Sequence, residues 1–344
     1  MAYIELDNGI KIGEGYKPYI VAEVNSSHFG DKEVAFQMID AARACGCDCV
    51  KFQSWSAESL YSKEYYKSNP IAARIVKKFS LDENSLLDCY YHCRDLGIGF
   101  SSTPYSKSEV DFLCDRVESA FIKIASMEVD NPKYLEYIAK KHKAIVLSTG
   151  MSDIDEIKRA VDTIVNAGNS RICILHCVSS YPAEDEAVNL RNICLLRDSF
   201  PDFPVGYSDH SIGHEIAGAA ISLGASFIEK HFTLDRSRIG MDNNMATEPE
   251  EMKRLVEGVN SVYKAMGSYE RKVSEDELKQ RLNMRRSIVT VKDLKSGDVI
   301  TEDAIGFKRP GTGISPAQYQ SIIGKKVRRD IEADYVIYPD DIAD

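Results

Sequence analysis

The hydrophobic pattern of the chain is a series of short apolar or β-branched runs that end in polar residues. Eight such runs occur before residue 267, and each is followed by a segment whose apolar residues have helical spacing. Buried parallel strands are typically this continuously hydrophobic. The runs are Tyr19–Val24, Cys49–Ser54, Ile98–Thr103, Phe121–Ser126, Ala144–Thr149, Ile172–Val178, Val205–Asp209 and Phe227–Thr233.

The segments between the runs have helical patterns, as in Lys32–Cys45, Asp153–Ala167 and Gly213–Leu223. Glycines that can end such helices follow several of them, at Gly46, Gly97, Gly168 and Gly224. A strand–helix unit repeated eight times predicts an α/β fold of the (β/α)₈ TIM-barrel type over residues 1–267.

Both flanks of the predicted barrel have patterns of their own. Residues 1–17 alternate around an Asn8-Gly9 turn, which predicts a hairpin that caps the barrel floor. Residues 268–284 are strongly charged and are interpreted as a linker. Short β-rich pieces follow in residues 285–344 and indicate a small β domain. The length of 344 residues suits a barrel of about 250 residues with an added module.

The composition excludes several classes of protein. Hydrophobic residues make up 44% and charged residues 28% of the chain, which is ordinary for a globular protein. A net charge of −10 argues against a nucleic-acid partner. No run reaches the roughly 20 apolar residues that cross a bilayer, and no signal peptide is recognisable, so we expect a cytoplasmic protein without a membrane partner.

The chain has nine cysteines, which is an odd number, and it is expected to be cytosolic. Both points argue against a disulfide framework. The CGCDC run at residues 45–49 lacks the paired spacing of a zinc site. We therefore interpret these cysteines as packing residues.

Polar residues collect at the ends of the predicted strands, where a TIM barrel carries its chemistry. Lys51 and Lys123 would be costly there without an anion, so they predict an anionic ligand. The alternative is that these lysines pair with Glu23 or Glu229. Hydroxyl groups that would complete a phosphate and carboxylate site stand at Thr103, Ser126, Ser179 and Ser208.

His210 and His231 end the seventh and eighth strands, which are neighbours in a closed barrel. Adjacent strands lie about 4.8 Å apart, so the two imidazoles are candidate ligands of one divalent ion with open positions. Glu23 and Glu229 end the first and eighth strands and are candidates for a general base or for binding a sugar hydroxyl. Their alternative role is to pair with Lys51 or Lys230.

Taken together, the strand-end motifs KFQS, FSSTPYS, IKIASME, LSTGM, LHCVSSYP, GYSDHS and IEKHFT, with FKRPGTGIS near the C-terminus, resemble the N-acetylneuraminate (sialic acid) synthase family. The resemblance runs from about residue 18 to the end and includes a small C-terminal antifreeze-like (SAF) domain. It implies transfer of a pyruvyl unit from phosphoenolpyruvate to N-acetylmannosamine or a related acylamino sugar. It also implies a domain-swapped homodimer in which Arg309 acts on the partner's barrel.

The same resemblance assigns roles to individual residues. It places phosphoenolpyruvate at Lys51, Thr103, Lys123, Ser126 and Ser208, and a manganese or similar ion (magnesium or cobalt as alternatives) at His210 and His231. It places the sugar at Glu23, Gln53, Tyr181, Glu229, Asp242 and Arg309.

Three departures from the family pattern concern the sugar and phosphate regions. The family usually reads E-I-G-x-N-H-N-G after the first strand, whereas residues 23–30 read EVNSSHFG. Ser179 replaces an asparagine, and Asn243 follows Asp242 where a histidine is usual.

Other functions stay open from the sequence. The acceptor could lead to legionaminic, pseudaminic or another nonulosonic acid, or could be a phosphorylated acylmannosamine. A keto-acid phosphate synthase or a Schiff-base aldolase using Lys123 is a second class of enzyme. A non-catalytic carbohydrate-binding or ice-binding protein is a third alternative, but it leaves the polar strand ends unexplained.

Overall fold

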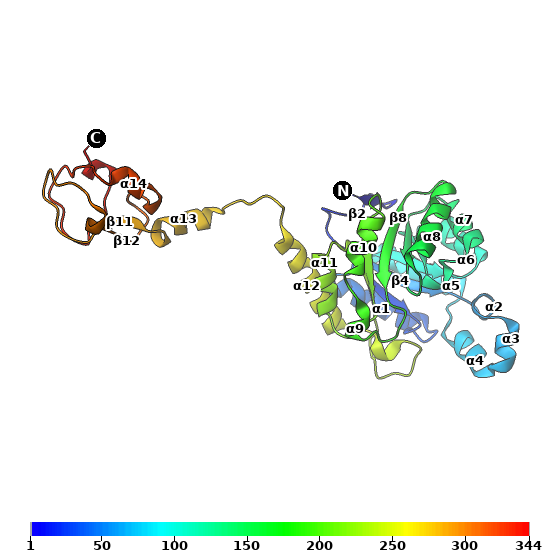
Figure 1. Ribbon diagram of the computed structural model, residues 1–344. Helices are drawn as coiled ribbons and strands as arrows, with labels where there is room; N and C mark the ends of the chain where they lie inside the picture. Colours follow the sequence, from blue (N-terminus) through cyan, green and yellow to red (C-terminus); the bar gives the residue numbers. More distant parts are fainter. Residues whose placement is uncertain (1, 344) are drawn as a thin grey trace. The chain divides into compact units, whose positions relative to one another are not determined.

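The computed structural model describes residues 2–343. The chain divides into two compact units, Met1–Gly267 and Ser268–Asp344. Within the described residues of the first unit, eight parallel strands form a closed barrel in the order β10-β3-β4-β5-β6-β7-β8-β9. The predicted TIM barrel is therefore confirmed, and Figure 1 shows helices surrounding its strands.

The barrel strands coincide with the eight hydrophobic runs. They are β3 (Tyr19–Asn25), β4 (Cys49–Ser54), β5 (Gly99–Pro104), β6 (Ile122–Ile124), β7 (Ile145–Ser148), β8 (Ile172–Cys177), β9 (Val205–Asp209) and β10 (Phe227–His231). The fourth barrel strand, β6, is shorter than the hydrophobic run Phe121–Ser126 that predicted it, because a 3-10 turn, Ser126–Glu128, begins soon after Ile124.

The helices of the barrel pack their apolar faces on the strands and form the main core. Helix α8 begins at a capping box in which Asp153 and Glu156 satisfy each other's backbone N–H groups. The outer helices are α1 (Lys32–Cys45), α5 (Glu83–Leu96), α6 (Lys107–Asp111), α7 (Pro132–Ala139), α8 (Ile154–Asn166), α9 (Asp185–Val188), α10 (Asn192–Ser199), α11 (Glu215–Ser222) and α12 (Pro249–Met266).

A three-helix excursion separates β4 from α5. It consists of α2 (Ala57–Leu60), α3 (Lys63–Ser68) and α4 (Pro70–Phe79), and it has a small core of its own. Trp55, Val76 and Phe79 are the buried residues of that core. Because Trp55 directly follows β4, the excursion is anchored beside the strand ends.

The N-terminal residues form an antiparallel hairpin of β1 (Tyr3–Glu5) and β2 (Lys11–Gly13). Its residues Ile4, Leu6 and Ile12 belong to a separate apolar cluster with Tyr19 and Phe121, near the starts of β3 and β6. The hairpin thus packs at the end of the barrel opposite to the strand ends that carry the polar residues.

The second unit contains α13 (Glu275–Met284), a two-stranded sheet of β11 (Ser287–Thr290) and β12 (Ile305–Lys308), and the short helix α14 (Tyr319–Ile322). The segment interpreted as a linker therefore carries a helix, which begins at a capping box of Ser274 and Glu277. The Leu282 carbonyl of this helix accepts a hydrogen bond from the Gly311 N–H at 2.8 Å. Several of the β-rich pieces form isolated bridges instead of longer strands.

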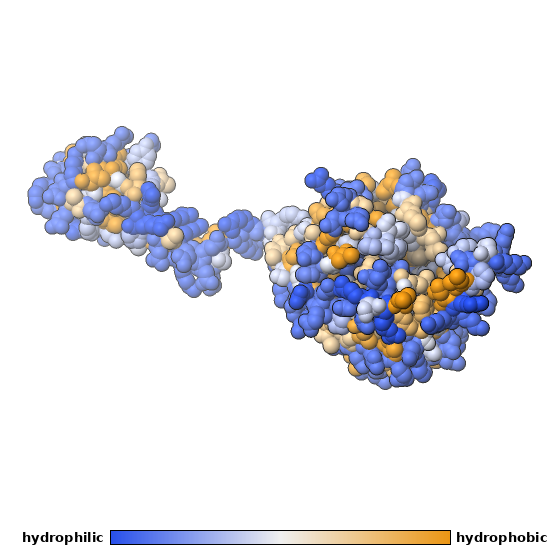
Figure 2. All heavy atoms as spheres, turned by 90° about the horizontal axis from the view of Figure 1, so that it is seen from below, coloured by the Kyte–Doolittle hydropathy of each residue, from blue (hydrophilic) through white to orange (hydrophobic). Residues whose placement is uncertain are grey.

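All nine cysteines are free, and Cys45, Cys47 and Cys49 are buried. Among the described helices, none is both long and apolar enough to cross a bilayer. The face of the barrel unit in Figure 2 is largely hydrophilic with scattered hydrophobic side chains, which is ordinary for a protein surface.

Candidate active site

The carboxyl ends of the barrel strands surround a pocket of about 290 Å³. It is lined by side chains from all eight strands or the residues that follow them. The predicted residues that line it are Glu23, Lys51, Gln53, Thr103, Lys123, Ser126, Ser179, Tyr181, Ser208, His210, Glu229 and His231.

Strand register explains why these residues meet. Glu23 on β3 is paired with Lys51 on β4 and with His231 on β10, and Ser208 on β9 is paired with Glu229 on β10. In a parallel barrel, residues at one level on neighbouring strands lie side by side. The strand ends therefore deliver carboxylates, an ammonium and an imidazole to one place.

The charged groups of the pocket form a buried network. Lys51 forms an ion pair with Glu23 and lies 3.6 Å from the Glu229 carboxylate. Lys123 Nζ lies 3.4 Å from Glu229 Oε1, and each of these four side chains is at most 5% exposed. The alternative expected from sequence, in which the lysines pair with glutamates, is thus realised in the structure, whereas Lys230 pairs with Asp209 at 2.9 Å.

The two glutamates experience opposite electrostatic environments. Burial, with the neighbouring Glu229 charge, raises the pKa of Glu23 to about 7 despite the opposing effect of Lys51. Burial also disfavours the Glu229 carboxylate, but Lys123 and Lys51 outweigh it and lower the pKa of Glu229 to about 2. A pair of carboxyl groups with separated pKa values is a common arrangement for proton transfer beside a fixed negative charge.

The lysines are also hydrogen bonded to hydroxyl groups. Lys51 Nζ donates to Thr103 Oγ1 at 3.0 Å, and Lys123 Nζ donates to Ser148 Oγ at 2.6 Å. Burial lowers the pKa of Lys123, whereas Glu229 and Glu23 offset burial and raise the pKa of Lys51. Two buried ammonium groups with adjacent hydroxyls can bind phosphate and carboxylate oxygens.

Small residues at the ends of β6, β7 and β8 complete this side of the pocket. Ser126 Oγ accepts a hydrogen bond from the Gly150 N–H at 3.0 Å and lies 3.3 Å from Cys177 Sγ. A Cβ atom at Gly150 would lie 2.3 Å from Ser179 Oγ and 2.9 Å from Ser126 Oγ, so only glycine fits there. The Gly150 backbone thereby approaches the hydroxyl groups closely.

His210 and His231 face each other with ring centroids 5.4 Å apart. The Nδ1 atom of His210 lies 2.7 Å from the Val178 carbonyl, which assigns its proton to Nδ1 and leaves the Nε2 lone pair available. Burial lowers the pKa of both imidazoles, which are therefore neutral at pH 7.

Neutral imidazoles with available lone pairs are suitable donors for a first-row divalent ion. Among the described residues, no group of three or more His, Cys, Asp or Glu side chains gathers around a possible ion position. The two imidazoles are thus the candidate protein ligands, and water or substrate would have to supply the other ligands of an ion held there.

Gln53 connects the pocket to the three-helix excursion. Its Nε2 donates to Glu23 Oε1 at 3.3 Å, while its Oε1 accepts from Trp55 Nε1 at 2.9 Å and from the Tyr105 hydroxyl at 3.2 Å. Sequence reasoning did not assign Trp55 or Tyr105 a role in the site. The sequence feature that could have indicated a role for them is their position directly after β4 and β5, in the QSW and TPY segments.

Other lining residues were also not proposed as site residues from the sequence. Tyr105, Met127, Ser148, Met151 and Cys177 all line the pocket. Cys177 directly precedes the VSSYP segment, and Ser148 directly precedes Thr149 at the end of β7.

Two predicted residues are not part of the pocket lining. Asp242 lies in the connection between β10 and α12, where its Oδ2 accepts a hydrogen bond from Asn25 Nδ2 at 2.7 Å. Arg309 belongs to the second unit.

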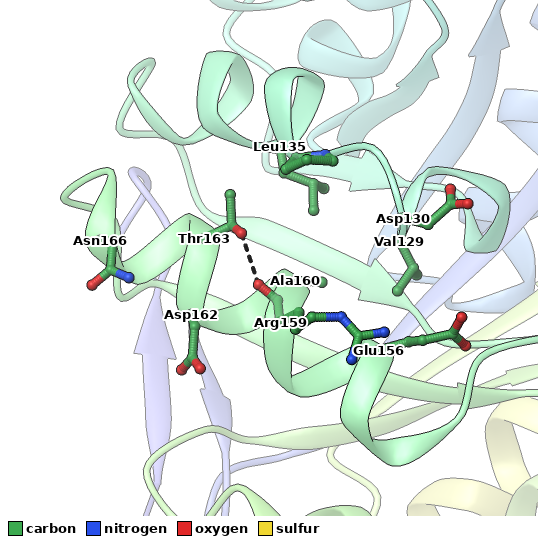
Figure 3. A pocket seen from close by; sticks show the side chains of 10 residues that line it. Val129, Asp130, Leu135, Glu156, Arg159, Ala160, Asp162, Thr163 and Asn166 are labelled. Carbon is green, nitrogen blue, oxygen red and sulfur yellow. Dashed lines mark hydrogen bonds between the residues drawn. The ribbon is translucent and has the colours of Figure 1, made fainter.

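A second cavity of about 370 Å³ lies between helices α7 and α8 on the outside of the barrel (Figure 3). Leu135, Ala160 and Thr163 contribute to its lining, and Thr163 Oγ1 donates to the Arg159 carbonyl within α8 at 2.7 Å. None of the predicted site residues lines it. The strand-end pocket is therefore the candidate active site.

Comparisons with known proteins agree with this architecture. The model of the NeuB family matches residues 38–271, and that of the SAF domain matches residues 285–343. The N,N'-diacetyllegionaminic acid synthase of Legionella pneumophila is 37% identical over 95% of each chain. The human N-acetylneuraminate-9-phosphate synthase is 34% identical over 97% of this chain and 95% of its own.

The solved structures include an N-acetylneuraminic acid (sialic acid) synthetase from Leptospira borgpetersenii in complex with citrate. It superposes with a TM-score of 0.74 at 33% identity and covers 81% of this chain and 94% of its own. The chain therefore shares both fold and sequence with synthases of nine-carbon sugar acids.

Proposed function

The chain belongs to the NeuB family, and from this membership we propose that it is a nonulosonic acid synthase. It condenses phosphoenolpyruvate with the open-chain aldehyde of N-acetylmannosamine or a related acylamino sugar and releases phosphate. The observation that supports this most directly is the strand-end pocket. Two buried lysines, two carboxyl groups with separated pKa values and two neutral histidines all line it.

Phosphoenolpyruvate is proposed to bind on the side of the two lysines. Lys51 and Lys123 would exchange part of their contact with Glu229 for the phosphate and carboxylate of the ligand. Both ammonium groups would keep an anionic partner in this exchange, because the ligand oxygens offer charge-assisted hydrogen bonds of the same kind. The hydroxyl groups proposed to complete this subsite are Thr103, Ser126, Ser179 and Ser208.

The acceptor sugar is proposed to lie over the opposite side of the pocket. Glu23 and Gln53 would contact its aldehyde end, and Tyr181 would pack on the chain of hydroxyl groups. Glu229, whose Oε1 accepts a hydrogen bond from Ser208 Oγ at 2.9 Å, would supply a constant negative charge beside the sugar. Asp242 and Arg309 are proposed to contact the far end of the sugar and its acyl group.

The reaction forms one carbon–carbon bond and one bond from C2 to a water oxygen, and it breaks the C2–O bond to phosphate. C3 of phosphoenolpyruvate attacks the aldehyde carbon while protonated Glu23 gives its proton to the aldehyde oxygen. A water molecule then adds to C2, and Glu23 takes a proton from it. This proton returns the carboxyl group to its starting state. The tetrahedral intermediate then expels phosphate by cleavage of the bond from C2 to the phosphate oxygen, the C2 hydroxyl becomes the ketone carbonyl, and its proton leaves with the phosphate.

A divalent ion, manganese before magnesium or cobalt, is proposed to be held by His210 and His231 and to polarise the aldehyde as a Lewis acid. The hydrogen bond of His210 to the Val178 carbonyl orients the ring for this role.

Arg309 and the homodimer belong to the same proposal. If each SAF domain completes the pocket of the partner subunit, then Lys123→Met and Arg309→Ala chains are each inactive alone but complement when mixed and allowed to exchange. Up to about a quarter of the wild-type activity per dimer would return with random pairing. Absence of complementation in an exchanged dimer would contradict the action of Arg309 on the partner.

The acceptor is the least defined part of the reaction. The Legionella relative bears the name of a diacetyllegionaminic acid synthase, so a diacetamido sugar is the second candidate acceptor. Imine chemistry at Lys123 is the competing mechanism, and borohydride in the presence of pyruvate would trap it. We expect no trapped adduct, because the proposed reaction needs no imine.

The first experiment measures phosphate release from phosphoenolpyruvate with Mn²⁺ and a panel of acylated hexosamines, followed by the product mass. Acceptor-dependent release with the mass of a nonulosonic acid is expected and would identify the sugar. No release with any acceptor from a folded, metal-loaded protein would overturn the proposal.

A further inference from the structure

The connection from β10 to α12 is fastened to the connection from β3 to α1 by side chains. Asn25 Nδ2 donates to Asp242 Oδ2 at 2.7 Å. The guanidinium of Arg238 lies over the Phe29 ring, 3.7 Å from its centroid, which is a close cation–π contact. We call these two contacts the loop latch.

The backbone of Asn25 joins the latch to the candidate active site. Its φ angle is 42°, in the left-handed region that asparagine tolerates better than most residues. In this conformation its N–H donates to Glu23 Oε1 at 2.9 Å. One residue therefore holds the carboxylate of Glu23 through its backbone and that of Asp242 through its side chain.

The loop that carries Asp242 has its own internal support. Asn243 is 1% exposed, and its Nδ2 donates to the carbonyls of Asp235 and Arg238 at 2.9 and 2.8 Å. A Cβ atom at Gly240 would lie 3.1 Å from the Phe29 ring, so the loop passes close to that side chain. The loop is thus fixed at both the Asp242 and the Arg238 positions.

Asp242 keeps hydrogen-bonding capacity in this arrangement. Among the described residues, Asn25 is its hydrogen-bond donor and occupies Oδ2, which leaves Oδ1 for a ligand. Its charge acts on the pocket: after burial and Cys177, Asp242 is the next contribution that raises the pKa of Tyr181, a lining residue.

Two of the positions that depart from the family pattern, Asn25 and Phe29, form one side of the latch, and a third, Asn243, supports the other. We propose that Asn25 is a positioning residue that sets the spacing between Glu23 and Asp242. The latch thereby sets which spacing of donor groups on the acceptor can reach both carboxylates. This inference rests on the proposed function.

The test compares Asn25→Gly with wild type and with Asn189→Gly. Glycine keeps the left-handed backbone and the N–H to Glu23 but removes the amide that binds Asp242. Asn189 is the matched control, because it is an exposed asparagine with a φ angle of 51° outside the strand-end pocket. Steady-state kinetics measure KM for the acceptor and for phosphoenolpyruvate separately. Hydrogen exchange measures the opening of residues 235–245.

For Asn25→Gly we expect KM for the acceptor to rise about tenfold while KM for phosphoenolpyruvate stays within about twofold. Exchange at residues 235–245 should become faster, and Asn189→Gly should match wild type in both measurements. An unchanged acceptor KM, or an equal rise for both substrates, would overturn the proposal.

The exchange measurement separates this proposal from the proposed function. If the wild-type protein turns over none of the acceptors, the proposed function fails, and with it the selection of sugars. Faster exchange at residues 235–245 in Asn25→Gly would then still support the positioning of the loop by Asn25. Unchanged exchange would overturn that as well.

Discussion

Lys51 and Glu23 occupy register-paired positions on β4 and β3, and their side chains form an ion pair that is 3% and 2% exposed. Lys51 also lies 3.6 Å from Glu229, so one ammonium group lies between two carboxyl groups. Desolvation makes such an arrangement expensive unless every charge keeps a partner. A ligand with two anionic groups could therefore change which of these charged side chains pair with each other.

Removal of the Lys51 cation should destabilise the fold. Lys51→Met leaves the two carboxyl groups without their shared partner, and we expect a loss of about 3–5 kcal/mol in the free energy of unfolding. Urea denaturation measures it. The double variant with Lys51→Met and Glu23→Gln should be more stable than Lys51→Met alone, because only one carboxylate, that of Glu229, then lacks the Lys51 cation.

The matched control is Lys17→Met, which removes a more exposed ion pair with Asp48 at 2.9 Å. We expect a change within about 1 kcal/mol there. Equal stability of Lys51→Met and wild type would show that the buried network does not depend on Lys51.

Substitution of Glu23 should affect proton transfer more than folding. Glu23→Gln keeps the shape of the side chain and one acceptor oxygen but removes the titrating group, so kcat should fall about 10²–10⁴-fold. Because the pKa of Glu23 is raised to about 7 and the protonated form starts the reaction, wild-type turnover should fall as pH rises through 7. That limb of the pH profile should be missing from the residual activity of the variant.

Glu229→Gln is the comparison for this prediction. The pKa of Glu229 is lowered to about 2, so the side chain does not change charge near neutral pH, and the limb at pH 7 should persist in this variant. A limb at pH 7 that survives in Glu23→Gln would assign the titration to another group.

Metal removal should abolish turnover and should be reversible. A chelator should remove activity, and Mn²⁺ should restore it in wild type but not in His210→Ala or His231→Ala. Electron paramagnetic resonance of added Mn²⁺ measures binding without turnover and should show weaker binding in both variants. His92→Ala, which alters a partly exposed histidine, is the control. A His210→Ala protein that is fully active in metal-free buffer would refute the metal role.

The hydrophobic runs predicted the barrel because buried parallel strands leave a continuous apolar signal. They also predicted the pocket, because polar residues that end such runs must gather at one edge: Lys51, Ser208 and His231 all do. The pairing of Lys51 with Glu23 was an open alternative, since it depends on strand register, which a sequence pattern does not fix.

Contacts made by loops were the main omissions. Trp55 stands two positions after Gln53 and Tyr105 follows the neighbouring strand β5, and both donate to the Gln53 side chain beside the apolar cluster of the excursion. Asn25 and Asp242 are separated by more than two hundred positions, and no local pattern relates them. Helix α13 was not predicted, because its sequence is highly charged and none of its residues is buried.

The buried histidine His28 should make the fold sensitive to acid. It is 2% exposed, and its Nδ1 accepts the Gly30 N–H at 3.0 Å, so the neutral imidazole is favoured. Burial lowers its pKa from 6.5 to about 4. The unfolded chain therefore takes up a proton below pH 6.5 that the folded chain does not accept until about pH 4, and stability falls as pH falls through that range.

The complete effect of this difference would be about 3 kcal/mol. The buried His210 and His231, whose pKa values are also lowered, add to it, whereas Glu23 acts in the opposite direction because its raised pKa of about 7 lets the folded protein take up a proton in this range. Urea denaturation at pH 7.5, 6 and 5 measures the slope of unfolding free energy against pH. His28→Gln removes the titrating group and should give a shallower slope than wild type, even where its overall stability is lower. His92→Gln provides the comparison at a partly exposed position. If wild type and His28→Gln have the same slope, His28 binds its proton as readily in the folded protein as in the unfolded chain, and the acid sensitivity originates at other groups, among them the buried His176, His210 and His231.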